Sequence, residues 1–135
     1  MVEAFVGSWT LQKSENFDDY MKNLDVNLVQ RKLACSVNPQ TVISVENDVI
    51  TITTKSKIKT TTIKFKLAEE FDETTADNRL TKTTVVLENG RLVQTQKWSG
   101  KETTLVRELK DGKMILICTM GNVVCTREYV RTKDD

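Results

Sequence analysis

The last two-thirds of the chain alternates apolar and polar residues in short runs that are separated by turn signals. The runs are rich in Thr, Val and Ile, which favours β-strands over helices. Strands are therefore expected at residues 49–54, 60–67, 80–87, 92–98, 103–109, 114–119 and 123–130. The turn pairs that flank these strands are typical of hairpins: Asn47-Asp48, Asn89-Gly90, Ser99-Gly100, Asp111-Gly112 and Gly121-Asn122. Tight turns predict an antiparallel meander, and closure of that meander into a barrel would protect its edges.

Residues 14–36 break this rhythm and contain no turn glycine, so they are expected to be helical. Phe17, Met21 and Leu24 are spaced at i, i+4 and i+7, which places them on one face of a helix. A second helix is expected at residues 27–36, with Val29 and Leu33 on one stripe. The candidate N-cap residues are Ser14 or Asn16 for the first helix and Asp25 or Asn27 for the second. The expected outline is one strand, two short helices and about nine further strands.

Composition limits the classes of function. The 135 residues fit one domain, 1–135, and 20 basic and 19 acidic side chains leave a formal charge of +1. Such a balance provides no strong field for nucleic acid, and the apolar runs are far too short for a transmembrane helix. The chain has no histidine, which removes the commonest general base and the commonest metal ligand. Because no catalytic or phosphate-binding motif occurs either, we expect neither an enzyme nor a cofactor.

The N-terminus and the cysteines indicate the compartment. The first residues include an acid, Glu3, and no long apolar segment, so they do not have the form of a secretory signal. The three cysteines, Cys35, Cys118 and Cys125, lack the spacing of metal ligands. In a cytoplasmic chain they are expected to be reduced, with Cys35 exposed and the other two facing inward.

The last predicted strands carry unexpected charges. Alternate side chains of a strand share a face, so Arg127 and Tyr129 lie on the same face as Cys125. By the same rule, Arg107 shares a face with Leu105. A buried charge is costly unless it is paired, and arginine presents a planar fork of donors that suits a carboxylate. Two inward arginines and a tyrosine therefore predict a carboxylate site inside the β-structure, although the residues alone fit equally well a structural role in which each arginine pairs with a buried acid.

Six segments of the chain resemble a known family. They read FVGSW (5–9), ENFDDYMK (15–22), FKL (65–67), EFDETTADNR (70–79), WSGKETT (98–104) and CTREY (125–129). Together they resemble the intracellular lipid-binding proteins, in particular the heart, adipocyte, brain, testis and peripheral-myelin branch of the fatty-acid-binding proteins. The resemblance implies a mostly β fold: a ten-stranded antiparallel up-and-down β-barrel (a calycin-like β-clam) with a two-helix lid between the first two strands. It also implies an internal, water-containing cavity for one fatty acid.

The resemblance assigns roles to particular residues. The ligand carboxylate would be held by Arg107, Arg127 and Tyr129, since relatives that bind an alcohol carry glutamine in place of the two arginines. Inward Gln94 and Gln96 fit a cavity that holds ordered water. The candidate residues lining the cavity are Phe17, Met21, Thr41, Ala76, Asp77, Gln96, Leu105 and Leu116. The portal would be formed by Val29, Leu33, Ile58 and Lys59, with Ile58 at a position where the family often has phenylalanine.

The leading hypothesis is an intracellular carrier of long-chain fatty acids that acts as a monomer in the cytoplasm. Lys22, Arg31 and Lys32 of the lid would either be a solvated face or form a patch for contact with anionic membranes or for nuclear import. The alternative of the same fold is a retinoic-acid carrier, which also needs paired arginines. A membrane-stacking structural protein is the third hypothesis, and the net charge of +1 argues against it.

Overall fold

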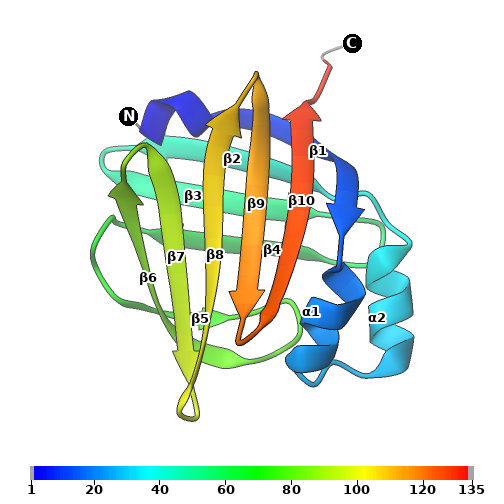
Figure 1. Cartoon of the computed structure of the whole chain (residues 1–135). Coiled ribbons are helices and arrows are strands. Elements are labelled where there is room, and N and C mark those ends of the chain that lie inside the picture. The colour runs from blue at the N-terminus through cyan, green and yellow to red at the C-terminus, as the bar shows by residue number, and fades with distance from the viewer. Residues whose placement is uncertain (1, 134–135) are drawn as a thin grey trace.

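The computed structural model describes residues 2–133 and consists mainly of one antiparallel sheet that curves into a nearly closed barrel (Figure 1). The strands follow the order β4-β3-β2-β1-β10-β9-β8-β7-β6-β5, so β1 pairs with the last strand and β4 and β5 end the sheet. Their bounds are β1 (Gly7–Glu15), β2 (Gln40–Glu46), β3 (Val49–Lys55), β4 (Thr60–Phe65), β5 (Phe71–Thr74), β6 (Leu80–Glu88), β7 (Arg91–Trp98), β8 (Lys101–Lys110), β9 (Lys113–Met120) and β10 (Val123–Arg131). The predicted ten-stranded up-and-down barrel is therefore confirmed. Residues 1, 134 and 135 of the predicted domain lie outside the described residues.

Two helices, α1 (Phe17–Asn23) and α2 (Leu28–Cys35), connect β1 to β2, as the sequence predicts. Asn27 caps α2, since its Oδ1 accepts a hydrogen bond of 2.9 Å from the amide of Gln30. Of the two predicted caps of α1, Ser14 belongs to β1, whereas Asn16 does occupy the N-cap position but makes no capping hydrogen bond through its side chain. The Asn16 backbone adopts a left-handed conformation (φ 63°), and the side-chain Nδ2 of Asn16 donates to the Val124 carbonyl at 3.2 Å. Within the described residues, no helix is long and apolar enough to cross a membrane.

The segment between β4 and β5 differs from the prediction. β4 ends at Phe65 rather than at residue 67, because Ala68 takes a left-handed conformation (φ 65°) that turns the chain. The sequence analysis missed β5 because its four residues, FDET, include two acids and only one apolar residue. No ladder joins β4 to β5. The rings of Phe65 and Phe71 stack there with centroids 5.3 Å apart, so side chains connect the two edge strands.

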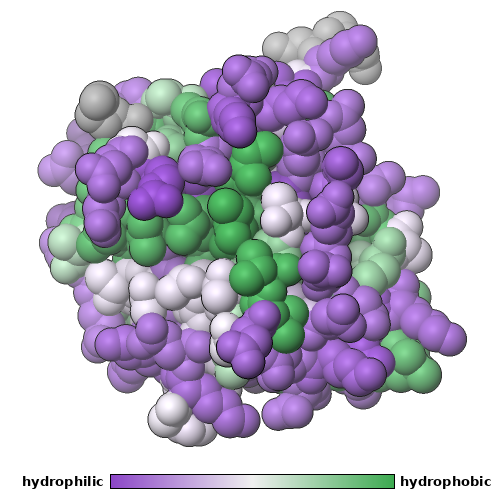
Figure 2. All heavy atoms as spheres, in the orientation of Figure 1, coloured by the Kyte–Doolittle hydropathy of each residue, from purple (hydrophilic) through white to green (hydrophobic). Residues whose placement is uncertain are grey.

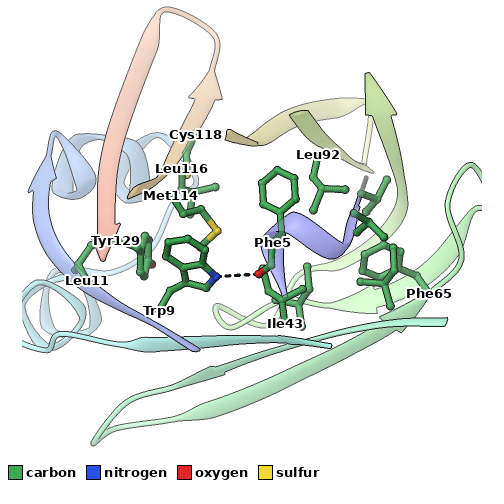
Figure 3. Close-up of a cluster of buried hydrophobic side chains, with 14 of the residues drawn as sticks. Phe5, Trp9, Leu11, Ile43, Phe65, Leu92, Met114, Leu116, Cys118 and Tyr129 are labelled. Atoms are coloured by element: carbon green, nitrogen blue, oxygen red, sulfur yellow. Dashed lines mark hydrogen bonds between the residues drawn. The ribbon is translucent and has the colours of Figure 1, made fainter. Parts of the chain in front are cut away.

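The hydrophobic core includes residues from a short 3-10 helix, η1 (Val2–Phe5), from α1 and from most of the strands. The helix η1 lies at the upper end in Figure 1, whereas α1 and α2 lie at the lower right. Figure 3 shows Phe5 and Trp9 among apolar side chains from several strands, with Trp9 Nε1 donating to the Phe5 carbonyl at 2.9 Å. The Arg131 guanidinium stacks on the outer side of this arrangement, 4.0 Å from the centroid of the Trp9 ring, and donates to the Ala4 carbonyl. The N-terminal segment is thus fastened to both β1 and β10.

The outer face of strands β6–β9 is unusually apolar. The register aligns Val86, Val93, Val106 and Ile117 in one row across these strands, and each is half-buried. Figure 2 shows apolar spheres forming a band across this face. The neighbouring residue on β8, Arg107, faces the other way and is buried. On the inner face, Arg107 is opposite the buried Leu92 and Leu116, so it is a charged residue in an otherwise apolar stretch of these strands.

Candidate ligand-binding site

The two inward arginines lie in one row of the inner face. Arg107 on β8 and Arg127 on β10 are both opposite Leu116 of β9, so their backbones are two strand spacings apart, about 10 Å. Their exposed fractions are only 7% and 5%. Tyr129 follows Arg127 on the same face and is 3% exposed. The alternation of side chains along the strands thus correctly predicted that all three side chains are buried.

Arg127 is held by neutral groups. Its Nη1 donates to Ser14 Oγ at 3.0 Å, and the register places Ser14 directly opposite on β1. Its Cζ lies 3.8 Å from the centroid of the Phe17 ring, a cation–π contact with the first residue of α1. No described acidic side chain forms an ion pair with Arg127. The charge is therefore oriented, but it is not neutralised by a direct partner.

Arg107 is less completely satisfied. Its Nη1 donates to Gln94 Oε1 at 3.0 Å, and its buried Nε has no hydrogen-bond partner among the described residues. Burial lowers the pKa of Arg107, while the nearby groups of Tyr129, Cys118 and Glu73 act in the opposite direction. A buried donor without a partner carries a free-energy penalty, so this guanidinium can gain from an additional acceptor.

The sequence analysis missed an acid inside the barrel, Glu73 of β5. Its Oε1 accepts three hydrogen bonds: from Thr83 Oγ1 at 2.9 Å, Gln94 Nε2 at 3.1 Å and Gln96 Nε2 at 3.0 Å. A signal was present, since Glu73 shares a strand face with Phe71 and that face turns inward. The short length of β5 concealed it. Gln94 therefore lies between Glu73 and Arg107 and contacts both.

The turn between β5 and β6 contributes a second polar cluster. Arg79 Nε forms an ion pair with Asp77 Oδ2 at 2.7 Å, and its Nη1 donates to Gln96 Oε1 at 3.1 Å. The Arg79 guanidinium also stacks on Trp98, 4.5 Å from the ring centroid. Burial would raise the pKa of Asp77, but hydrogen bonds from Arg79 and Thr75 outweigh it and hold that pKa below its ordinary value. Asp77, predicted to line the cavity, is thus already paired.

The other predicted lining residues come from four different elements. Met21 of α1, Thr41 of β2 and Leu116 of β9 are buried, whereas Phe17 and Leu105 are half-buried. Ala76 lies in the exposed turn between β5 and β6. Its carbonyl accepts a hydrogen bond of 2.7 Å from Lys59 Nζ, which joins this turn to the turn between β3 and β4.

The predicted portal residues are all exposed. Val29 and Leu33 of α2 are 69% and 47% exposed, and Ile58 is 48% exposed. Lys59 lies beside Ile58 in the turn between β3 and β4. Exposed apolar side chains on the lid and on this turn fit a surface that opens or contacts other molecules. Among these portal residues, Lys59 forms a side-chain hydrogen bond to the turn between β5 and β6, at the Ala76 carbonyl.

The three basic residues of the lid differ in their surroundings. Lys22 and Lys32 are exposed. Arg31 instead joins the two helices: its Nε pairs with Asp18 Oδ1 at 3.0 Å, and its Nη1 donates to the Val26 carbonyl at 2.7 Å. The side chain of Arg31 therefore has a structural role in the lid.

A pocket of about 480 Å³ lies between β1 and the two helices. Its lining includes Ser14, Phe17, Cys35 and Arg127, so it reaches the Arg127 contacts. Cys35 is exposed, as predicted, whereas Cys118 and Cys125 are buried and directly opposite each other on β9 and β10. In the part of the chain that the structure describes, no cluster of acidic residues and cysteines is arranged to hold a metal ion.

A small up-and-down barrel with a helical lid and buried arginines that lack a direct acidic partner defines a class of proteins that enclose a ligand. Residues 6–132 match the model of the lipocalin / cytosolic fatty-acid binding protein family, and the chain belongs to this family. The family is one of binding and carrier proteins rather than enzymes.

Individual relatives are similar to this chain over nearly its whole length. Human fatty acid-binding protein 9 is 54% identical over 129 residues, which cover 96% of this chain and 98% of the relative. Among solved structures, the REP1-NXSQ fatty acid transporter superposes with a TM-score of 0.94 at 44% identity, over 98% of this chain and 99% of the other. A Schistosoma mansoni fatty acid binding protein in complex with arachidonic acid gives a TM-score of 0.93 at 35% identity, over 98% of both chains.

Proposed function

We propose that this protein is an intracellular carrier that binds one long-chain fatty acid inside the barrel and holds its carboxylate with Arg107, Arg127 and Tyr129. The observation that carries the proposal is the pair of buried arginines on one inner row, neither of which forms a direct ion pair with a described acid. The purely structural role for these arginines would require such an acid. The orphaned Nε of Arg107 and the neutral partners of Arg127 favour a ligand oxygen instead.

The two parts of a fatty acid would contribute differently. Each methylene removed from water contributes roughly 0.8 kcal/mol, so a long tail can contribute on the order of 10 kcal/mol before the costs of association. A charge-assisted hydrogen bond to the head group contributes about 1.5–3 kcal/mol. The tail therefore supplies most of the affinity, whereas the arginines supply the preference for an acid over an alcohol. Two relatives, a fatty acid transporter and a fatty acid binding protein in complex with arachidonic acid, support this assignment.

The experiment compares two ligands that differ only in the head group. Calorimetric titrations with hexadecanoate and with hexadecanol should give an affinity at least about tenfold higher for the acid. Equal affinities would contradict a carboxylate site. Retinoic acid in the same assay tests the alternative ligand class, and a clear preference for it over hexadecanoate would assign the chain to that class.

The proposal extends to delivery of the ligand. Exposed Val29 and Leu33, together with the cations Lys22 and Lys32, give the lid an amphipathic surface suited to brief contact with anionic membranes. The protein would act as a monomer in the cytoplasm, and the same cations would serve in nuclear import. Replacing Lys22 and Lys32 by glutamine should slow transfer of a fluorescent fatty acid to anionic vesicles but not to neutral ones. Unchanged transfer to anionic vesicles would make these lysines an ordinary solvated face.

A further inference from the structure

Glu73 is the buried acid nearest to the proposed carboxylate site, and it occupies the centre of a hydrogen-bond network. It is 9% exposed, and three donors converge on its Oε1, from Thr83, Gln94 and Gln96. An ionised carboxylate only accepts hydrogen bonds, which matches three converging donors. Its position inside a binding cavity that would receive another carboxylate requires an explanation, because like charges at short range repel.

The two glutamines connect Glu73 to cations. The Gln94 amide donates to Glu73 through Nε2 and accepts from Arg107 Nη1 through Oε1, at 3.1 Å and 3.0 Å. Gln96 does the same between Glu73 and Arg79, at 3.0 Å and 3.1 Å. Each amide dipole therefore points its positive end at the acid and its negative end at a guanidinium, an arrangement in which the successive hydrogen bonds strengthen one another.

The two linked arginines are not equivalent. Arg79 already has Asp77 as a direct partner at 2.7 Å, so that pair is neutral by itself. Arg107 has no direct acidic partner among the described residues, so Glu73 is its counter-charge at one amide's distance. The guanidinium of Arg127 is held by Ser14 and Phe17, and neither side chain is charged. The positive charge that lacks a counter-charge thus lies on Arg127.

The buried charges can be counted. Among the described residues, the charged side chains that are buried are Glu73, Arg107 and Arg127, which leave a net single positive charge inside the barrel. Charges inside a protein are weakly screened, so an uncompensated charge is expensive there. A ligand with one negative charge neutralises the interior. A ligand with two negative charges at its head would leave an excess negative charge beside Glu73.

We propose that the buried charge of Glu73, which balances that of Arg107, restricts this cavity to amphiphiles whose head group carries a single negative charge and excludes dianionic heads such as phosphate monoesters. This inference rests on the proposed function and adds a specificity-determining residue to it. Glu73 acts by its charge and does not need to touch the ligand. It also separates the roles of the two arginines: Arg127 neutralises the ligand, whereas Arg107 adds hydrogen-bond donors whose charge is already balanced.

The test uses two probes of equal chain length, hexadecanoate and hexadecyl phosphate, at pH 8, where a phosphate monoester carries nearly two charges. Wild-type protein should bind the carboxylate at least about tenfold more tightly than the phosphate. Glu73→Gln keeps the size of the side chain, removes its charge, and should shrink this ratio by at least about tenfold. The control Gln94→Met breaks the connection to Arg107 without changing the net charge. In this variant, the ratio of the hexadecanoate affinity to the hexadecyl phosphate affinity should stay within about threefold of the wild-type ratio.

A second measurement needs only the wild-type protein. The second pKa of a phosphate monoester is about 6, so hexadecyl phosphate is largely a monoanion at pH 5.5 and a dianion at pH 8. Relative to hexadecanoate, its affinity for the wild-type protein should fall about tenfold between these pH values. A constant ratio across pH, or an identical ratio in wild type and folded Glu73→Gln, would overturn the role of Glu73. Failure of hexadecanoate to bind the wild type would instead overturn the proposed function itself.

Discussion

The guanidinium of Arg127 stacks on the ring of Phe17, with 3.8 Å between Cζ and the ring centroid. This contact joins the last strand to the first residue of α1, two segments that lie more than a hundred residues apart in the sequence. The side chain that is proposed to meet the ligand is therefore positioned by the lid. A substitution at Phe17 should therefore change the affinity of the proposed carboxylate site for its ligand.

Replacing Phe17 by leucine tests this connection. A cation–π contact of this kind contributes roughly 0.5–2 kcal/mol, so hexadecanoate should bind between about twofold and thirtyfold more weakly. Calorimetric titration measures the loss, and Phe17→Tyr, which keeps the ring, should retain most of the affinity. Full affinity in Phe17→Leu would show that Ser14 alone orients the guanidinium.

Replacing Arg127 by glutamine should separate head-group recognition from tail burial. The variant loses the uncompensated cation, so hexadecanoate should bind about 10–100-fold more weakly while hexadecanol binds as before. Displacement of a fluorescent ligand measures both affinities, and circular dichroism verifies that the barrel is intact. If the acid and the alcohol weaken equally, the residue supports the fold and not the ligand.

The hydrogen bond from Lys59 Nζ to the Ala76 carbonyl, at 2.7 Å, should slow passage of the ligand because it ties two turns together. In Lys59→Met, the association and dissociation rate constants for hexadecanoate should both rise, by about twofold to tenfold, with little change in Kd. Stopped-flow fluorescence gives both constants. The matched control is Lys57→Met, which removes an exposed charge from the same turn. A rise of similar size in the control would attribute the effect to charge rather than to the link.

An added side chain at Gly7 would be strained and would displace the Arg131 guanidinium. The φ of Gly7 is +130°, and a Cβ there would collide with the Arg131 guanidinium, which fastens the N-terminal segment. Gly7→Ala should therefore lower the free energy of unfolding by about 1–3 kcal/mol in urea denaturation. Gly90→Ala is the control, since it has a positive φ (+77°) but no atom within 4 Å of the added methyl. An equal loss in both variants would leave only backbone strain as the cause.

Cys35 should be the first thiol to react with iodoacetamide, because it is exposed whereas Cys118 and Cys125 are 2% and 0% exposed. Partial burial raises the pKa of the Cys35 thiol, so less thiolate is present at neutral pH than in a free cysteine. Its labelling rate should thus be low at pH 7 and should still be rising above the ordinary thiol pKa. Peptide mass spectrometry identifies the modified site, and Cys35→Ser should abolish the fast phase. Early modification of Cys118 or Cys125 would mean that the barrel opens more readily than the lid.

Much of the fold could be predicted from local patterns. Strand alternation and hairpin turn pairs located seven of the ten strands, and parity alone placed Arg107, Arg127 and Tyr129 on the inner face. The same reasoning failed at β5, whose four residues are too few and too polar to show a period. It predicted Asn16 as a cap of α1 but not that the side chain of Asn16 would bond to the distant Val124 rather than to a helix amide.

The sequence by itself determined which side chains face inward, because a strand turns successive residues to opposite sides regardless of what surrounds it. Only the tertiary structure decided what those side chains meet. The pairing of β1 with β10 brings Ser14 to Arg127, and the folding of β5 against β6 brings Glu73 within reach of Gln94 and Gln96. These neighbours are set by long-range register, which local periodicity does not encode. For that reason both inward arginines could be predicted from the sequence, whereas Glu73, the counter-charge of Arg107, could not.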